Sequence, residues 1–515
     1  MPGVTAKATA MDRVTIGGAA LRFEDLRSIA SGARVTLSPD AAARVAPSRA
    51  LVERLLKQGS TVYGVNTGFG QLQSVRVSAG DVEQLQLNLI RSHASGFGPE
   101  LEPKAVRLML ALRAHSLALG YSGVRLTLLE HIVRMIESEI LPVVPSRGSL
   151  GASGDLIPLA HLALGVIGEG EVRAEGRLAL ASDLMRGNGM APLQLQAKEG
   201  LALINGTQGM TSVGAQALLE AAEVLRAAHV ACALSVEAAR GSTKPFDPRV
   251  HAIRPHPGQR DSAATLWGLL HGSGIVASHQ DCEKVQDPYS LRCAPQVLGA
   301  SVDAFRGARE TLVTEVNSVS DNPLCFADTG EVISAGNFHG QPVALALDFL
   351  AIAMAEVGSI AERRTFLLLD SGKSGLPPFL SPAPGLRSGL MIVQYLQAAL
   401  VTENKMLAQP ASVDSIPTSA GQEDHVSMGM HAAVKALSLV RNVRRIVAAE
   451  LLCAAQGIHL LHPLRSSERL MRAVEGLRGV VPPLDEDRRQ DRDLAALDEW
   501  IASGAAADLA QVEAF

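Results

Sequence analysis

The sequence of 515 residues contains few aromatic side chains: they make up 3% of it, with only four tyrosines and two tryptophans. Hydrophobic residues nevertheless reach 47%, so aliphatic side chains, mainly alanine and leucine, must supply the core. This composition disfavours a β-sandwich and favours long aliphatic helices. We therefore expect an all-α (mainly α) fold, with more than one structural unit because the length exceeds what one core usually serves.

Charge and cysteine patterns are equally sparse. The formal net charge is only -5, and no long block of lysine or arginine occurs, so the sequence indicates no nucleic-acid partner. The five cysteines form no C-x-x-C pair, which favours free thiols in a reducing, cytoplasmic compartment. Residues 1–15 lack the apolar stretch of a signal peptide, and Asp348 and Glu356 interrupt the strongest apolar run, 343–357. We expect no membrane partner and no metal site, and this apolar run needs protein neighbours.

The pattern of the chain changes near residue 200. Residues 1–200 mix short elements with glycine-rich loops, residues 201–480 carry long helical patterns, and residues 481–515 form a charged C-terminal appendage with one last helix. Tyr395 lies in an apolar stretch and is predicted to be a core residue. Broad apolar faces predict a helix bundle that other subunits complete. The long helices are predicted at 207–240, 297–318, 342–366, 387–409 and 427–460.

The glycine-rich segment 148–158 has an unusual chemical option at its centre, Ala152-Ser153-Gly154. Attack of the Gly154 nitrogen on the Ala152 carbonyl carbon would form an imidazolone, and loss of water from Ser153 would leave an electrophilic methylidene. Glycine suits this reaction because its nitrogen is unhindered and its backbone bends readily. The tripeptide occurs three more times in the chain, so taken alone a flexible connection is an equally good interpretation. Only this copy combines further glycines before it with a carboxylate, Asp155, directly after it.

Several polar residues outside this segment are candidates for chemistry. Tyr63 and Tyr289 lie in loops; such tyrosines usually pack, but a phenol can act as a base where positive charge or hydrogen bonds lower its pKa from about 10. His93 near a helix end and Asn205 at a helix entrance are most simply a satisfied histidine and a cap. The 422–425 segment would ordinarily be a solvated charged turn. Each residue taken alone therefore has an ordinary structural explanation.

Seven segments in order together resemble the aromatic amino acid ammonia-lyase family, over roughly residues 12–480. This resemblance implies a long-helix bundle of the fumarase/aspartase-like type, with a mixed, loop-rich N-terminal domain that carries the cofactor. Seven motifs in register are highly specific. The matching segments are 63–70, 92–94, 148–155, 204–208, 286–292, 336–340 and 422–428.

The resemblance also implies roles for individual residues. Ala152, Ser153 and Gly154 would cyclise autocatalytically to methylidene-imidazolone (MIO), without a metal or nucleotide, and the substrate amine would add to it so that ammonia becomes a good leaving group. Tyr63 would remove the β-proton, and the planar fork of Arg292 would pair with the substrate carboxylate. The remaining implied positions are Asn205 and Tyr289 near the ring and amine, Gln286 beside the carboxylate, and Phe338 against the substrate and cofactor.

Substrate choice depends on two pairs, Ser92-His93 and Gln422-Glu423. Phenylalanine and tyrosine members carry Phe-Leu or His-Leu at the first pair and Asn-Gln at the second. A buried imidazole ring needs hydrogen-bond partners, which His93 and the catalytic Glu423 would supply, whereas a phenyl ring would leave the carboxylate unpaired. We therefore expect elimination of ammonia from L-histidine to give trans-urocanate.

Three kinds of alternative stay open at this point. A relative could act on phenylalanine or tyrosine, could be an aminomutase that returns ammonia to the β-carbon, or could keep the fold without turnover. Departures from the family pattern at Ala294, Gln341 and Gly421 bear on the shape of the pocket but remove no named catalytic group. Family members are homotetramers with active sites assembled from three subunits, so the resemblance implies a homotetramer here.

Overall fold

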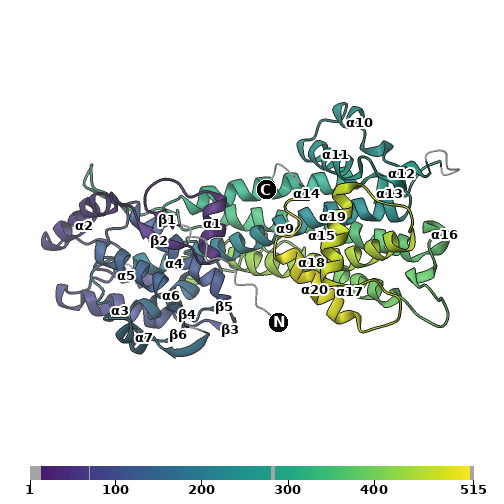
Figure 1. Cartoon of the computed structure of the whole chain (residues 1–515). Coiled ribbons are helices and arrows are strands. Elements are labelled where there is room, and N and C mark those ends of the chain that lie inside the picture. The colour runs from purple at the N-terminus through teal and green to yellow at the C-terminus, as the bar shows by residue number, and fades with distance from the viewer. Residues whose placement is uncertain (1–12, 69, 73, 175, 280–284, 511–515) are drawn as a thin grey trace. The chain divides into compact units, whose positions relative to one another are not determined.

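The computed structural model describes residues 13–510 apart from 69, 73, 175 and 280–284 (Figure 1). Contacts between residues divide the chain into two compact units. Each unit is discontinuous in the sequence, whereas the expected boundaries at residues 200 and 480 give contiguous domains. The reason is that the chain passes between the units within four of its long helices. Unit 1 comprises Met1–Gln216, Arg309–Leu347 and Pro410–Val434, and unit 2 comprises Ala217–Ala308, Asp348–Gln409 and Lys435–Phe515.

Five long helices lie within a few residues of the predicted tracts, so this prediction is confirmed. Strands in the described residues are short and form separate two- or three-stranded sheets. The fold is therefore mainly α, as the aliphatic composition predicts. The long helices are α9 (Gln208–Ala238), α14 (Ala294–Val316), α15 (Gln341–Leu369), α17 (Met391–Leu407) and α18 (Gly429–Leu460).

Unit 1 contains the shorter elements. The strands β1 and β2 pair in parallel, with Arg13 opposite Arg34 and Ile16 opposite Leu37. The pairs β3–β5, β4–β6, β6–β7 and β8–β9 are antiparallel. The elements are β1 (Arg13–Ile16), α1 (Phe23–Ala30), β2 (Arg34–Leu37), α2 (Ala41–Lys57), α3 (Val82–His93), β3 (Phe97–Glu100), α4 (Pro103–Ala118), α5 (Leu126–Glu137), β4 (Leu141–Pro142), β5 (Pro145–Arg147), α6 (Leu156–Val166), β6 (Glu171–Ala174), β7 (Arg177–Leu180), α7 (Ala181–Gly187), α8 (Glu199–Ile204), β8 (Leu324–Phe326) and β9 (Glu331–Ile333).

The helix α4 forms the centre of unit 1 and is buried on every side along most of its length. Its His115 accepts a hydrogen bond at Nδ1 from the Gly17 backbone N–H at 2.9 Å, so that nitrogen carries no proton. Burial lowers the pKa of His115 to about 4, and the ring stays neutral at physiological pH. This neutral histidine links α4 by a hydrogen bond to Gly17, the residue directly after β1.

Three mutually packed helices, α3, α6 and α8, place the ends of the chain segments that matter for function. All of α8 is buried, and α6 is apolar except for His161 at its middle, so both must lie inside the unit. His93 is the last residue of α3, Asp155 directly precedes α6, and Asn205 directly follows α8. Helix packing in the core thus brings these three residues to a common region.

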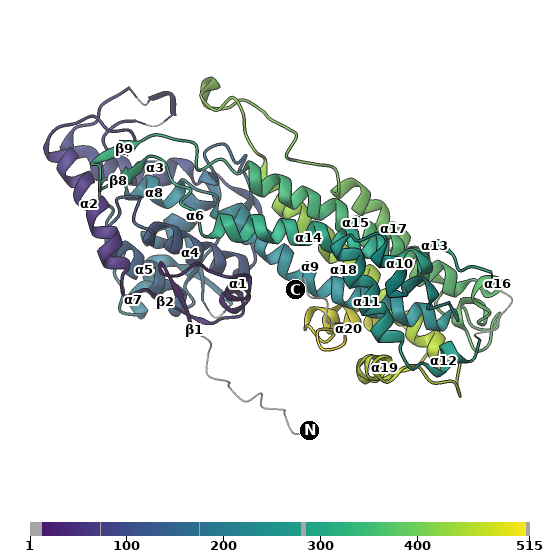
Figure 2. The same ribbon diagram turned by 90° about the horizontal axis from the view of Figure 1, so that it is seen from above.

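Unit 2 is a bundle of long helices that run alongside one another (Figure 2). Polar groups tie the helices together: the buried Arg364 of α15 pairs with the buried Glu450 of α18, which also accepts from Ser235 of α9 at 2.7 Å. Gln397 of α17 donates to the Ile446 carbonyl oxygen of α18 at 2.8 Å. The other helices of this unit are α10 (Pro248–Ala252), α11 (Pro257–Leu270), α12 (Gly274–Ala277), α13 (Tyr289–Arg292), α16 (Ser371–Ser374), α19 (Glu468–Val480) and α20 (Gln490–Ala502).

An apolar stripe on α15 and α17 stays exposed. Tyr395, predicted as a core residue, is 60% exposed, so that prediction is wrong. Its neighbours Val393 and Gln397 point inward, and residues two positions apart face opposite sides of a helix. By length and composition α15 could cross a membrane, but 61% of its most apolar window is buried, as in a core helix. The exposed residues of the stripe are Leu345, Phe349, Ile352, Phe366, Ile392, Tyr395, Leu396 and Met406.

The described cysteines, Cys232, Cys293, Cys325 and Cys453, are free thiols. Three of them are buried and Cys293 is partly exposed. The fifth, Cys282, lies outside the described residues. The observed free thiols agree with the prediction drawn from their scattered spacing.

Candidate active site

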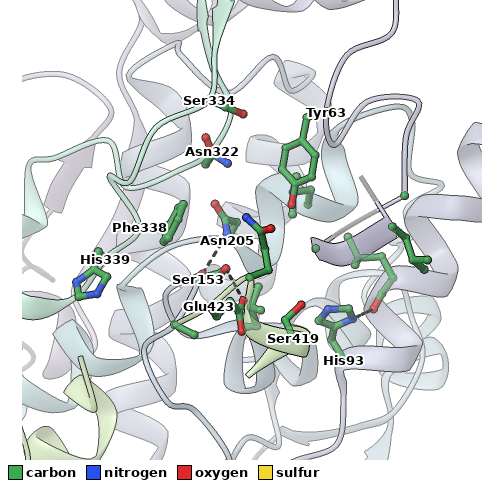
Figure 3. A pocket seen from close by; sticks show the side chains of 18 of the residues that line it. Tyr63, His93, Ser153, Asn205, Asn322, Ser334, Phe338, His339, Ser419 and Glu423 are labelled. Atoms are coloured by element: carbon green, nitrogen blue, oxygen red, sulfur yellow. Dashed lines mark hydrogen bonds between the residues drawn. The ribbon is translucent and has the colours of Figure 1, made fainter. Parts of the chain in front are cut away.

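A cavity of about 810 Å³ opens in unit 1, and most of the residues predicted to form a site line it (Figure 3). This is enough room for a single amino acid with space to spare. Polar groups from six separate chain segments converge on it. The predicted site residues among those that line the cavity are Tyr63, His93, Ala152, Ser153, Asn205, Phe338, Gln422 and Glu423.

The backbone of the Ala152-Ser153-Gly154 loop is held in a conformation that strongly favours glycine. Gly151 and Gly154 have φ values of +67° and +73°. A Cβ atom at Gly154 would lie 2.2 Å from the carbonyl oxygen of Gly206, too close for any side chain. Directly after it, the Asp155 N–H donates to that same Gly206 oxygen at 2.7 Å. The loop is therefore pressed against the segment that follows α8.

The other three copies of the tripeptide lack this confinement. A Cβ atom at Gly32 would meet no atom within 4 Å, and at Gly504 the nearest atom would be 3.5 Å away. At Gly96 the nearest atom, 3.0 Å away, belongs to the side chain of His161 rather than to backbone. Only the copy at 152–154 lines the cavity and has a glycine whose Cβ would collide with backbone atoms. The structure therefore singles out the same copy that the neighbouring residues indicated in the sequence.

Asp155, the residue after the tripeptide, anchors the loop through hydrogen bonds to its carboxylate. Its fully buried carboxylate accepts from Ser149 Oγ at 2.7 Å and from the Met210 N–H, in the first turn of α9, at 2.6 Å. Burial raises the pKa of Asp155 to about 6, although these hydrogen bonds act in the opposite direction. The carboxylate joins the loop, α6 and α9 in one rigid framework.

Asn205 and Glu423 hold the serine of the tripeptide from two sides. Asn205 Nδ2 donates to the Ser153 carbonyl oxygen at 3.0 Å, and Ser153 Oγ donates to Glu423 Oε1 at 2.8 Å. The other carboxylate oxygen of Glu423 accepts from Thr418 Oγ1 at 2.7 Å. The amide oxygen of Asn205 is buried and has no hydrogen-bond partner among the described residues. It is free to accept from a ligand donor.

His93 presents a neutral ring to the cavity. Its Nδ1 lies 2.8 Å from the Leu89 carbonyl oxygen, which can only accept, so Nδ1 carries the proton and Nε2 is left as an acceptor. Burial lowers the pKa of His93, while that hydrogen bond and the charge of Glu423 act in the opposite direction. His93 and Glu423 thus offer two acceptors to a ring that carries N–H groups.

Tyr63 reaches the same space with its hydroxyl directed toward it (Figure 3). Burial raises the pKa of Tyr63, and the Glu423 carboxylate raises it further, while a hydrogen bond from the Gly70 backbone opposes both. The condition for a phenol base, a lowered pKa, is therefore not met within this one chain. Phe69, in the same motif, lies outside the described residues.

Four predicted site residues do not line this cavity. Gly154 lies in the tripeptide loop beside it, whereas Gln286, Tyr289 and Arg292 belong to unit 2, where Tyr289 is 69% exposed. The Arg292 guanidinium stacks on the Tyr289 ring at 4.4 Å from its centroid, and its Nε donates to the Asp287 carbonyl oxygen at 2.9 Å. Arg292 and Tyr289 are therefore in contact with each other, in a different unit from the one that contains the tripeptide.

The cavity also contains residues that sequence reasoning assigned no role. Asn322, Ser334, His339 and Ser419 line it, and Thr418 anchors Glu423 from just outside. His339 lies in a matched motif, and Asn322 precedes a proline, which would have indicated only a turn. Thr418 gives no signal in the sequence because its contact with Glu423 depends on the tight turn between them.

Comparison with known proteins gives consistent matches over the whole chain. A family model described as aromatic amino acid lyase matches residues 21–479. A histidine ammonia-lyase of Anaeromyxobacter dehalogenans is 51% identical, over 96% of this chain and 99% of that one. The crystal structure of histidine ammonia-lyase from Trypanosoma cruzi superposes with a TM-score of 0.91 at 42% identity, covering 98% of this chain and 96% of that one. Tyrosine aminomutase from Streptomyces globisporus superposes with a TM-score of 0.92 at 38% identity, covering 96% and 98%.

Proposed function

The chain belongs to the aromatic amino acid lyase family, and from this premise we propose that it eliminates ammonia from L-histidine to give trans-urocanate. It is a carbon–nitrogen lyase, and similar proteins named histidine ammonia-lyase match it at about half of all positions over its full length. The observation that carries the choice of histidine is the polar end of the cavity, where Glu423 and the neutral His93 face the ligand space.

The residues present fit a methylidene-imidazolone formed from Ala152, Ser153 and Gly154. Cyclisation needs the Gly154 nitrogen close to the Ala152 carbonyl carbon, and the bend at 151–153, next to the contact of Gly154 with Gly206, favours such an approach. The buried, unpaired oxygen of Asn205 lies beside the loop, where a substrate amine would supply the missing donor. Once formed, this group supplies an electrophilic carbon that takes up the substrate amine and turns ammonia into a leaving group.

Recognition of the substrate ring follows from the acceptors of the cavity. An imidazole N–H can donate to Glu423 or to His93 Nε2, whereas a phenyl ring has no donor and would leave a half-buried carboxylate without a partner. Sites built to hydrogen-bond a polar substrate reject an analogue that lacks the group by large factors. This contrast favours histidine over phenylalanine. Phe338 supplies an apolar wall of the same cavity.

Removal of the β-proton is assigned to Tyr63. Because burial and Glu423 raise its pKa, Tyr63 holds its proton in the isolated chain. A positive charge brought near the phenol would lower that pKa, and the substrate ammonium and an arginine guanidinium are the available cations. Tyr63 therefore becomes a base only when the cavity is filled.

The cavity of a single chain has no arginine among the described residues that line it, and this observation bears on the oligomeric state. Arg292, Tyr289 and Gln286 do not line the cavity of their own chain, and we propose that another copy of the chain supplies them in a homotetramer. The exposed apolar stripe on α15 and α17 supports association, because monomeric proteins rarely leave such a surface in water. Arg292 would then pair with the substrate carboxylate through two parallel hydrogen bonds.

Turnover of separate amino acids tests the proposal. Purified protein is incubated with L-histidine, L-phenylalanine or L-tyrosine, and ammonia, the acrylate absorbance and β-amino acids are measured. We expect ammonia and urocanate from histidine alone. β-Amino acids from tyrosine would identify an aminomutase, the activity named for one structural neighbour, and absence of urocanate would overturn the proposal. A Ser153→Ala variant is the control, because it cannot form the methylidene.

A further inference from the structure

A buried arginine without a carboxylate partner lies close to the tripeptide loop. Arg113 of α4 is fully buried, and among the described residues its guanidinium donates only to neutral groups. Burial lowers the pKa of Arg113 to about 10, so the side chain stays charged at neutral pH. The Asp321 carboxylate opposes this shift but is itself paired with the buried Lys198 at 2.7 Å. Burial of such a charge is costly, so its position calls for a physical explanation.

The guanidinium joins the two helices that flank Asn205. Arg113 Nε donates to the Ala202 carbonyl oxygen at 2.7 Å, and Nη2 donates to the same oxygen. Nη1 donates to Gln208 Oε1 at 2.8 Å. Ala202 lies in the last turn of α8, where carbonyl groups have no partner within the helix, and Gln208 is the first residue of α9. One planar group therefore spans the short segment from which Asn205 reaches the cavity.

The same guanidinium lies against Gly206, the residue that contacts the tripeptide loop. A Cβ atom at Gly206 would lie 2.3 Å from Arg113 Nη1, so no side chain fits between them. The Gly206 carbonyl oxygen accepts from the Asp155 N–H at 2.7 Å and leaves no room for a Cβ at Gly154. Gly206 is therefore in close contact both with the guanidinium and with the loop that carries Ser153.

We propose that Arg113 is a positioning residue that holds Asn205 and Gly206 in place against the tripeptide. The inference rests on the proposed function, because it assumes that the tripeptide cyclises and that Asn205 contacts the substrate. Asn205 Nδ2 donates to the Ser153 carbonyl oxygen at 3.0 Å, and its own amide oxygen has no partner among the described residues. A shift of the segment would break the first contact and misdirect the second. A displacement of about 1 Å is enough to lower a rate by about 10²-fold.

A second arginine of the same helix provides a matched control. Arg107 of α4 is also buried, donates to three backbone carbonyl oxygens at 2.7–3.0 Å and pairs with Glu139, and none of these groups lines the cavity. Arg107→Lys and Arg113→Lys each keep the charge but replace a planar fork with one ammonium group, so both should lower the urea midpoint. Only Arg113→Lys should disturb the site.

Maturation of the tripeptide gives a readout that needs no turnover. Trypsin cleavage after Arg147 and Arg173 releases one peptide that contains residues 152–154 and none of the other three copies. Complete maturation removes two waters from this peptide, about 36 Da. Full-length chains are sampled by mass spectrometry at times after synthesis. Arg113→Lys should lose the waters at least about 10-fold more slowly than the native chain, and Arg107→Lys should lose them at the native rate.

A double-mutant cycle tests whether the effect passes through Asn205. Expressed per mature chain, Arg113→Lys should lower kcat/KM for L-histidine by about 10²-fold where Asn205 is present, and by much less in an Asn205→Ala chain. Equal losses in the two backgrounds would show that Arg113 acts elsewhere and would overturn the positioning role.

Where Arg113→Lys does not fold, its partner Gln208 decides the question. Gln208→Met removes the acceptor of Nη1 at similar size, whereas Gln208→Glu keeps it, so the methionine chain should mature more slowly. Equal maturation rates for these two chains, or for the two lysine variants, contradict the inference. A native chain that loses no water would instead refute the proposed cofactor, so the two failures are distinguishable.

Discussion

Substitution of Asp155, the buried carboxylate directly after the tripeptide, should stabilise the protein. The pKa of Asp155 is raised from 3.8 to about 6, because loss of hydration outweighs the hydrogen bonds from Met210 and Ser149. A folded chain that binds this proton more tightly than the unfolded chain loses stability as the pH rises through the window from 3.8 to about 6. At about 1.4 kcal/mol for each pKa unit, the ionised carboxylate lowers the free energy of unfolding by about 3 kcal/mol at pH 7.5, and by about half as much at pH 5.

The variant Asp155→Asn removes this charge with little change in shape. The amide oxygen can accept from the Met210 N–H, and the amide nitrogen can donate to Ser149 Oγ, which is able to accept. We therefore expect the variant to unfold at higher urea concentration than the native chain at pH 7.5, with the gain falling by about half at pH 5. The exposed Asp183→Asn in α7 is the matched control and should show no such trend.

Urea midpoints at pH 7.5 and pH 5 measure this at one fixed protein concentration, because subunit association also contributes to stability. The comparison uses the difference between the two pH values, so a constant loss or gain from repacking cancels. A stability difference of the same size at both pH values would refute the reasoning, and so would a variant that becomes relatively less stable as the pH rises.

Three further predictions concern other residues of the chain. In a Ser153→Ala background, which cannot form the cofactor, adding Glu423→Gln should move the spectroscopic titration of Tyr63 to lower pH, because the Glu423 charge raises that pKa; no shift would contradict the assigned cause. The buried His115 has its pKa lowered to about 4, so the folded chain binds fewer protons than the unfolded chain below pH 6.5. Stability present above pH 6.5 is therefore lost as the pH falls toward 4, by about 3 kcal/mol, and urea midpoints of His115→Gln should fall less steeply. Arg292→Met and Ser153→Ala chains, each inactive alone, should regain activity when co-expressed as hybrid tetramers, whereas hybrids that stay inactive would show that each cavity uses its own chain's arginine.

The sequence predicted well those features that depend on local pattern. The five predicted long helices lie within a few residues of their predicted bounds, because apolar periodicity over many turns is a property of each segment alone. The special status of residues 152–154 was also readable, since only this copy has further glycines before it and a carboxylate directly after it; in the structure Gly151 and Gly154 adopt positive φ values. Eight of the predicted site residues line one cavity, and four of them, His93, Ala152, Ser153 and Asn205, do so because they lie at the ends of helices that pack together.

Features that depend on contacts between distant segments could not be read in this way. Thr418 holds Glu423 only because a strained turn folds one back onto the other. The interleaving of the two units follows from long helices that pass through both, and composition along the chain does not record it. Tyr395 was placed in the core because an apolar neighbourhood does not say whether a face packs within its own chain or against another copy.

The site combines a rigid backbone with polar atoms that the chain itself leaves unsatisfied. The amide oxygen of Asn205 is buried without a partner among the described residues, and loss of the Ser153 hydroxyl would leave Oε1 of the half-buried Glu423 without its donor. An unpaired buried acceptor costs about 1–3 kcal/mol, so the Asn205 oxygen destabilises the empty site. A ligand with an ammonium group and a ring N–H satisfies both and recovers that free energy on binding. A phenyl ring satisfies only the first, so selection for histidine arises from what the wrong ring leaves unpaired rather than from a closer fit to the right one.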